Sequence, residues 1–244
     1  MAEIVQHYGN HLGPVYSWLV GGLDSALARG ESELESLGIQ PSKGGVALDL
    51  GAGFGMHSIP LARRGYSVLA VDTCGILMEE LESHRASLPI RSVLADLCDF
   101  DRHLAGKANW ILCMGDTICH LPDLNAIQGL VNRIATSLEV GGTFVTSFRD
   151  YTSELREDAR FIPVRSEDSR ILTCFLEYGE THVKVHDLLH ERTATGWKLA
   201  VSSYSKVRLP PAWLMGILEQ AGFSVVRQTG LSGMVRIVAT LAQR

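Results

Sequence analysis

The sequence predicts an α/β fold: a doubly wound, mostly parallel seven-stranded sheet with an antiparallel β insert and N-terminal helices. Three observations support this prediction. From Val46 onward, short apolar runs alternate with helical segments, which is typical of a parallel sheet covered on both faces. After residue 150, several strand-like runs follow one another without helices between them. The chain then closes with a helix and a hairpin.

Residues 1–45 are expected to form a helical cap. Apolar side chains recur at helical spacing over residues 12–23, and Pro14 suits a first helical turn. The glycine pair at 21–22 interrupts this pattern. A second, acidic helix is expected to run over residues 27–38.

The first part of the core is expected over residues 46–150, where five apolar runs predict parallel strands. These strands are Val46–Leu50, Ser67–Val71, Arg91–Ala95, Trp110–Met114 and Thr143–Ser147. Three helical segments between the runs predict the helices that cover the sheet. These helices are expected at about 55–64, 75–87 and 123–138.

Residues 151–208 are expected to form the antiparallel insert, because no helix separates their strands. The strands are Ile171–Tyr178, His182–Leu189 and Lys198–Lys206. Residues 209–244 complete the core, with a helix opened by Pro210-Pro211 and a closing hairpin of 223–228 and 234–241. All 244 residues are expected to form a single domain.

Composition narrows the possible partners. The net charge is −5, from 22 basic and 27 acidic residues without a dense basic run, which disfavours nucleic acid as a partner. The start does not resemble a signal peptide, and no apolar stretch reaches membrane-spanning length, so no membrane association is expected. The five cysteines are scattered, which is typical of a cytoplasmic protein without disulfides or a zinc site.

Three evenly spaced histidines in the insert raise the question of a metal site. His182, His186 and His190 would lie on one face of a strand. Four strand residues span about 13 Å, whereas two ligands of one zinc ion must lie much closer together. No metal site is therefore expected.

The strongest motif is a glycine loop at the end of the first strand. Its residues are Asp49-Leu50-Gly51-Ala52-Gly53-Phe54-Gly55. Glycines let the backbone bend tightly and approach a ligand, and the following helix offers free N–H groups. Asp72 ends the next strand, where an acid can accept both hydroxyls of a ribose. Met56 stands where the dinucleotide fingerprint requires glycine, and Asp49 suits a cofactor's amino group but repels a pyrophosphate.

With these features the chain resembles the class I S-adenosylmethionine-dependent methyltransferases over roughly residues 46–150 and 210–242. The matching motifs are Ala95-Asp96-Leu97 after the third strand, Met114-Gly115-Asp116 after the fourth, Gly141-Gly142 before the fifth and Ala221-Gly222-Phe223 before the hairpin. The resemblance implies S-adenosylmethionine as cofactor. The expected contacts are Asp49, Gly51, Ala52, Gly53, Gly55, Asp72, Thr73, Asp96, Leu97, Met114 and Asp116.

Simpler structural roles are open for several of these residues. The glycines can serve a tight strand–helix turn alone, Asp96 can cap a helix, and Asp116 can cap a short turn. In the resemblance, Asp96 lies near the adenine amine and Asp116 beside the adenosine and the reacting methyl group. For Asp96 and Asp116, a capping role predicts that the carboxylate accepts a backbone N–H. A cofactor role predicts that the carboxylate faces the ligand.

The segment after the fourth strand, from Met114 to Leu121, ends in His-Leu. It resembles small-molecule N-methyltransferases, including glycine N-methyltransferase-like and amino-sugar enzymes, in which this histidine faces the acceptor amine. His120 would then be catalytic, since a near-neutral pKa suits proton removal. Alignment supplies much of the rate of methyl transfer, and a base is needed only if the acceptor arrives protonated. The alternative is a histidine that caps or packs the helix from Pro122.

The same resemblance covers the acceptor side. Tyr16 is a catalytic candidate that can contact the acceptor or the methyl group, although its apolar neighbours also fit a core role. Trp18, Arg149 and Tyr151 are the expected substrate contacts, with Arg149 pairing with an acidic group on the acceptor or standing solvated. The insert is expected to cover the acceptor pocket or to form a homodimer contact.

The expected function is S-adenosylmethionine-dependent methyl transfer to an amine or hydroxyl of a small-molecule metabolite. One alternative is a non-catalytic partner subunit that binds the cofactor. Another is a methyltransferase for a macromolecule, disfavoured because Met-Gly-Asp-Thr replaces the Pro-Pro-aromatic motif of nucleic-acid amino-methylating enzymes. A nicotinamide oxidoreductase is disfavoured by Met56 and by the terminal hairpin.

Overall fold

The computed structural model describes residues 2–242 and confirms the predicted α/β class, with a seven-stranded main sheet and a separate four-stranded sheet. The main sheet has the order β10-β11-β5-β4-β1-β2-β3. Its strands are β1 (Val46–Leu50), β2 (Ser67–Asp72), β3 (Ile90–Leu94), β4 (Ala108–Cys113), β5 (Leu138–Phe148), β10 (Phe223–Thr229) and β11 (Val235–Leu241). β1 to β5 pair in parallel, whereas β11 runs antiparallel to both β5 and β10.

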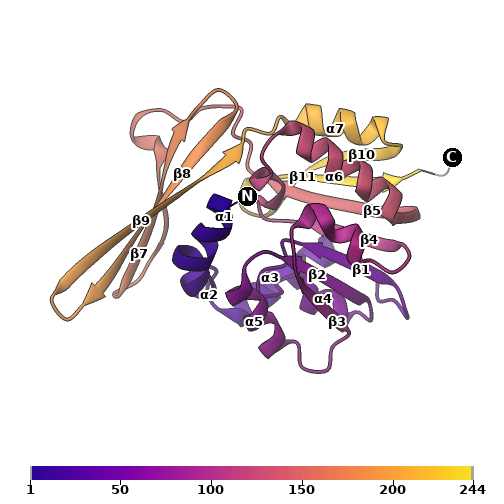
Figure 1. Ribbon diagram of the computed structural model, residues 1–244, viewed down its shortest axis with the longest axis horizontal. Helices are drawn as coiled ribbons and strands as arrows, with labels where there is room; N and C mark the ends of the chain where they lie inside the picture. Colours follow the sequence, from indigo (N-terminus) through magenta and orange to yellow (C-terminus); the bar gives the residue numbers. More distant parts are fainter. Residues whose placement is uncertain (1, 243–244) are drawn as a thin grey trace.

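Both faces of the main sheet are apolar because alternate strand residues point to opposite sides. Leu48 and Ile111 face α6 (Leu124–Ser137) and α7 (Pro211–Gln220). Ala47 and Leu112 face α3 (Leu23–Ser36), α4 (Ser58–Arg63) and α5 (Gly75–His84). Figure 1 shows the sheet with α6 and α7 on one side and α3 to α5 on the other.

Two glycine-rich segments shift the predicted boundaries. The loop glycines Gly51, Gly53 and Gly55 all have positive φ, so the chain cannot become helical until Ser58, where α4 begins. β5 begins at Leu138, so the glycine pair at 141–142 lies inside this strand and not before it. Gly141 has φ +80°, and the β4–β5 register shifts between Ala108 and Trp110, which makes the first part of β5 irregular.

The N-terminal cap is more segmented than its apolar spacing predicts. It consists of α1 (Ala2–His7), a π-helical turn (Tyr8–Leu12), a 3₁₀ turn (Gly13–Val15) and α2 (Tyr16–Leu19). Gly13 donates its backbone N–H to the Tyr8 carbonyl, and a side chain at this position would overlap that oxygen. Two glycines with positive φ then separate α2 from α3.

The insert forms an antiparallel sheet in the order β6-β7-β8-β9. Its strands are β6 (Phe161–Ser166), β7 (Arg170–Tyr178), β8 (His182–Thr193) and β9 (Gly196–Val207). The sequence did not predict β6, which contains Pro163 and a register shift beside it, as expected of an edge strand. Figure 1 shows this sheet extending away from the main sheet, with α1 and α2 between the two. The expected homodimer through this sheet stays a prediction.

No helix between residues 2 and 242 combines the length and the apolar composition that a bilayer crossing requires.

Candidate active site

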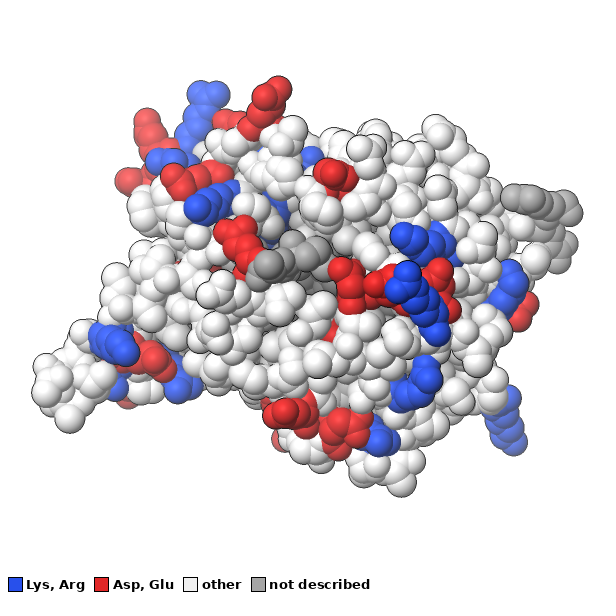
Figure 2. All heavy atoms as spheres, in the orientation of Figure 1, with Lys and Arg blue, Asp and Glu red and all other residues white. Residues whose placement is uncertain are grey.

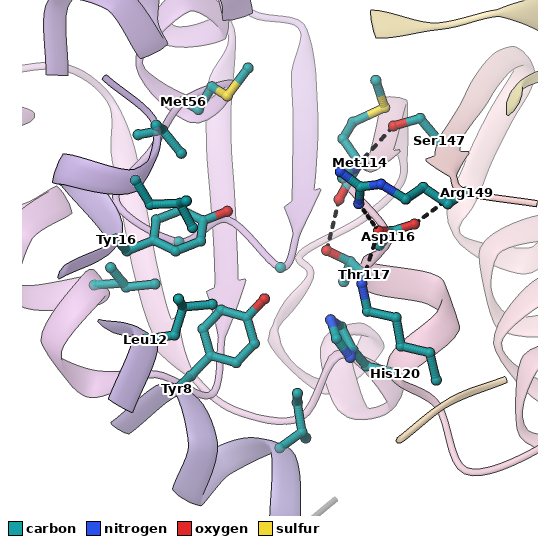
Figure 3. Close-up of a pocket in the computed structure, with 18 of the residues that line it drawn as sticks. Tyr8, Leu12, Tyr16, Met56, Met114, Asp116, Thr117, His120, Ser147 and Arg149 are labelled. Carbon is teal, nitrogen blue, oxygen red and sulfur yellow. Dashed lines mark hydrogen bonds and ion pairs between the residues drawn. The ribbon is translucent and has the colours of Figure 1, made fainter. Parts of the chain in front are cut away.

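A cavity of about 470 Å³ lies at the carboxyl ends of β1, β2 and β4 and extends beneath the N-terminal cap and the insert. In Figure 3, Tyr8 and Tyr16 of the cap lie on one side of it, and Asp116 and His120 lie on the other. Ligands of doubly wound sheets bind at this edge. The cavity is therefore the candidate active site.

The glycine loop forms one end of the cavity and is held by backbone hydrogen bonds. The N–H groups of Gly51 and Ala52 donate to the Val71 carbonyl at 2.8 and 3.1 Å, which ties the loop to β2. Gly51 has φ +78°, and a Cβ there would overlap the Thr117 side chain. Only glycine therefore suits this position without strain.

Asp72 lies between this loop and α5. Its Oδ2 accepts the Gly53 N–H and its Oδ1 accepts the Cys74 N–H, both at 2.8 Å. Burial raises the pKa of Asp72, and the surrounding backbone N–H groups oppose that shift. The carboxylate is thus held at the cavity wall by backbone N–H groups of the loop and of the segment before α5.

Most expected cofactor residues line the cavity. These are Gly51, Ala52, Gly53, Asp72, Thr73, Leu97, Met114 and Asp116. Three others, Asp49, Gly55 and Asp96, do not line the cavity, and their expected cofactor contacts stay predictions. Asp49 is buried and accepts a 2.6 Å hydrogen bond from Ser58 Oγ, behind the loop. Asp96 caps the 3₁₀ helix Leu97–His103 by accepting the Cys98 N–H, as its alternative interpretation predicted, and Gly55 packs against Leu81.

Asp116 lines the cavity, but its carboxylate is engaged by protein cations and not free beside an adenosine. Its Oδ1 accepts the Arg149 backbone N–H at 2.6 Å. Its Oδ2 lies 2.9 Å from Lys206 Nζ and also pairs with the Arg149 guanidinium. Burial alone would raise the pKa of Asp116, but the charges of Lys206 and Arg149 outweigh it and hold the pKa below its usual range. The expected cofactor contact of Asp116 stays a prediction, and the carboxylate has protein cations as its partners.

The turn that carries Asp116 is bound to the end of β5. Gly115 and Asp116 have φ of +69° and +75°, and the second is unusual for a residue with a side chain. Gly115 N donates to Ser147 Oγ at 3.0 Å, and Asp116 N donates to the Ser147 carbonyl at 2.9 Å. These bonds and the buried ion pairs hold the turn in its left-handed conformation.

His120 ends the 3₁₀ helix Thr117–His120 and lines the cavity. Its ring centroid lies 5.9 Å from that of Tyr8 and 5.4 Å from that of Tyr204. Its buried Nδ1 has no hydrogen-bond partner within residues 2–242. Burial, aided by the nearby Lys206 charge, lowers the pKa of His120 to about 3. The imidazole is therefore neutral at physiological pH.

The expected acceptor-side residues divide into two groups. Tyr16, Arg149 and Tyr151 line the cavity. Trp18 does not: it packs against the insert, where the Arg165 and Arg170 guanidinium groups lie 5.5 and 5.9 Å from its ring centroid. Residues two positions apart in a helix point to different faces, so Tyr16 and Trp18 do not face the same pocket. The expected substrate contact of Trp18 is therefore corrected.

Sequence reasoning missed several cavity residues that come from the cap and the insert. These are Tyr8, Asp187, Tyr204 and Lys206. Asp187 on β8 accepts a 2.8 Å hydrogen bond from Cys174 Sγ and lies 3.1 Å from His7 Nε2. Side chains alternate along β9, so residues 204 and 206 lie on the same face of the insert. A lysine on the face that also carries Tyr204 was the sequence signal that could have indicated these two cavity residues.

A cluster of three polar side chains lies at the loop end of the cavity. Its members are Arg29, Glu33 and His57, which line the wall. His57 Nε2 lies 2.9 Å from Glu33 Oε2. The Nε of Arg29 is buried without a hydrogen-bond partner in the described part of the chain. This arginine is therefore available to an anionic ligand group.

Two of the three insert histidines, His182 and His186, have protein partners, whereas His190 Nδ1 is buried without a hydrogen-bond partner in the described residues. His182 Nε2 lies 2.9 Å from the Pro122 carbonyl, and His186 pairs with Glu177. Within residues 2–242, no group of three histidine, cysteine or acidic side chains is arranged to hold a metal ion.

Comparisons with known proteins agree with the core of the fold. Residues 47–142 match the family model described as a methyltransferase domain. The chain is 26% identical to mouse glycine N-methyltransferase over 123 residues and to the human protein over 125 residues. Each match covers 43% of this chain and 40% of the relative, so the chain matches less than half the length of these curated relatives.

Solved structures extend the likeness to nearly the whole chain. The methyltransferase CcbJ of Streptomyces caelestis superposes with a TM-score of 0.77 at 19% identity, covering 97% of this chain and 98% of that one. DesVI of Streptomyces venezuelae gives a TM-score of 0.73 at 17% identity, covering 94% and 98%. CalS10 of Micromonospora echinaspora, an amino pentose methyltransferase, gives 0.71 at 16%, covering 95% and 97%. The matched methyltransferase domain, the glycine N-methyltransferase relatives and the shared fold together support a class I S-adenosylmethionine-dependent methyltransferase.

Proposed function

We propose that this protein transfers a methyl group from S-adenosylmethionine to an amine or hydroxyl of a small molecule. The observation that carries the proposal is a single cavity with two different ends. One end has the glycine loop and Asp72, and the other is lined by polar side chains of the cap and the insert. A donor and an acceptor held in one enclosed cavity can be aligned for displacement, which lowers the entropic cost of the reaction.

The residues of the loop end fit the cofactor. Asp72 lies at the cavity wall, where its carboxylate can accept hydrogen bonds from the two ribose hydroxyls. Leu97 and Met114 supply an apolar wall for the adenine. The unpartnered Nε of Arg29 suits the carboxylate of the methionine part. The structure of MtfA, a glycopeptide N-methyltransferase with the same fold, contains S-adenosylmethionine, which supports this assignment.

When bound, the cofactor supplies an electrophilic methyl group on a sulfonium. The side chains of this chain orient the acceptor and exclude water. A general base works best with a pKa near the working pH, so a histidine with a pKa of about 3 holds a proton poorly. We therefore assign His120 to hydrogen bonding with the acceptor through its unpartnered nitrogen, beside the Tyr8 ring.

The enclosure of the site favours a small acceptor over a macromolecule. The cap and the insert both contribute side chains to the wall, so the cavity has a roof as well as a floor. Figure 2 shows acidic and basic side chains interspersed on one face of the molecule, without a broad basic area. A nucleic-acid enzyme needs such an area to displace counterions from phosphates.

Calorimetry with purified protein tests the proposal. S-adenosylmethionine and its demethylated product should both bind, and Asp72→Ala should weaken binding by about a hundredfold, since two hydrogen bonds to a charged group contribute about 3 kcal/mol together. Asp101→Ala, an exposed acid outside the cavity, is the control and should bind normally. Labelled methyl should then reach members of a panel of small amines and alcohols.

Two results would contradict the proposal in different ways. Cofactor binding without transfer to any small acceptor would favour the non-catalytic partner subunit. Absence of binding by the wild-type protein would remove the cofactor assignment itself.

A further inference from the structure

Lys206 is a buried ammonium group at the wall of the cavity. It lies on β9 of the insert, and only 6% of its side chain is exposed. Its Nζ lies 2.9 Å from Asp116 Oδ2, the one hydrogen-bond acceptor that it contacts within residues 2–242. An ammonium has three donors, so two of them are unused by the described residues.

Lys206 shares its carboxylate partner with a second cation. Asp116 is one carboxylate shared by two cations, Lys206 and Arg149, and both cations line the cavity. The rings of Tyr151 and Tyr204 lie 5.9 and 5.6 Å from Lys206 Nζ, which gives partial cation–π compensation but no negative charge.

The other three acids on the cavity wall have partners of their own. Glu33 Oε2 lies 2.9 Å from His57 Nε2 at the loop end. Asp187 lies 3.1 Å from His7 Nε2 and accepts the Cys174 thiol. Asp72 accepts backbone N–H groups at the loop end. A buried cation is costly unless an opposite charge or hydrogen-bond acceptors compensate it. The acceptor end thus has two cations that share the carboxylate of Asp116, and Lys206 has donors that no described residue uses.

We propose, on the basis of the function proposed above, that the methyl acceptor carries an anionic oxygen group that binds Lys206 together with Arg149. The guanidinium of Arg149 suits two oxygens of one carboxylate or phosphate, and Lys206 adds a point charge. Asp116 is a positioning residue, because it holds both cations at the wall. Lys206 is then the specificity residue that separates anionic acceptors from neutral ones.

Calorimetry on protein saturated with the demethylated cofactor provides a direct test. The probes are acetate, inorganic phosphate and methylammonium at equal ionic strength, and the two anions distinguish a carboxylate site from a phosphate site. At least one anion should bind, and Lys206→Met should weaken that binding about tenfold or more, the loss expected for one charged hydrogen bond. Lys206→Arg keeps the charge and should retain most of the affinity.

Lys184→Met is the matched control, because Lys184 is exposed on β8 and lies outside the cavity. It should bind the anion as the wild type does. If neither anion binds the wild type, or if Lys206→Met binds both as tightly, the proposal is wrong. If Lys206→Met fails to fold, the absence of anion binding by the wild-type protein would still show that the proposal is wrong.

Transfer assays then compare amines that differ only in carrying a carboxylate or a carboxamide, or a phosphate or a hydroxyl. The wild type should methylate the anionic member of a pair faster, and Lys206→Met should lose that preference. Equal rates within every pair would overturn the anionic-acceptor proposal while leaving the methyltransferase proposal intact. Failure of the wild type to bind the cofactor would overturn the methyltransferase proposal first.

Discussion

The two ends of the cavity are built in different ways. At the loop end, the residues joined by a key hydrogen bond, Gly53 and Asp72, are 19 positions apart in the sequence. At the acceptor end, Asp116 and Lys206 are 90 positions apart. A site formed by backbone at neighbouring strand ends leaves a compact sequence motif. A site formed by side chains from distant elements does not.

The two ends also differ in what holds them. Backbone hydrogen bonds and positive φ values at glycines shape the loop end. Buried ion pairs shape the acceptor end, where burial penalises each charge and the partner compensates it. The loop end should therefore be sensitive to added volume, and the acceptor end to lost charge.

Asp116→Asn should have the largest effect on stability. Removing the carboxylate leaves Lys206 buried without its charge partner, and breaking a buried pair in this way costs about 3 to 5 kcal/mol. Urea unfolding measures the free energy of unfolding. Asp99→Asn is the control, since its pair with Arg102 is exposed and should contribute about 0 to 1 kcal/mol. Equal losses of unfolding free energy in the two variants would show that the buried ion pairs of Asp116 stabilise the protein no more than an exposed pair does.

Gly51→Ala should have an intermediate effect, at the loop end. The new Cβ overlaps Thr117 and the φ of +78° strains any side chain, so we expect a loss of about 1 to 3 kcal/mol and weaker cofactor binding. Adding Thr117→Ala removes the atoms that overlap most and should restore part of the stability. Gly129→Ala, in α6 with open space around it, is the control and should stabilise the protein slightly. If Gly51→Ala bound the cofactor as tightly as the wild type, the glycine at this position of the loop would not be required for cofactor binding.

His120→Gln should have the smallest effect, visible in the pH dependence of stability. The folded pKa of about 3 lies below the unfolded value of about 6.5, so the unfolded state takes up a proton first as pH falls. Stability from this group is therefore complete above about pH 6.5 and declines below it, by about 1 kcal/mol at pH 5.5. His120→Gln should flatten this decline, whereas His84→Gln, on the exposed surface of α5, should not. An unchanged slope in His120→Gln would show that its imidazole is not held neutral.

Much of the core could be predicted because its patterns are local. Strand–helix alternation predicted the five parallel strands of the main sheet, and the closing hairpin predicted the other two. The run of strands without helices predicted the antiparallel insert. β6 was missed because Pro163 weakens a strand pattern even where an edge strand tolerates it. The cap was predicted as helical, but its π-helical and 3₁₀ turns depend on packing beneath the insert.

Spacing along the chain was enough to place the loop and Asp72 at the cavity, since parallel strand ends share one edge of a sheet. It was not enough for Asp116, whose carboxylate orientation depends on Lys206 in a strand far away in the sequence. Spacing also could not predict that Tyr16 lines the cavity and Trp18 does not. Which face of α2 meets the cavity depends on how the insert packs against it.

The sequence by itself determined the fold class and the loop end of the site, because backbone geometry depends on residues close together in the chain. The tertiary structure alone decided the acceptor end. There, burial makes every charge depend on its partner, and the partners meet only after the cap, the main sheet and the insert have packed together.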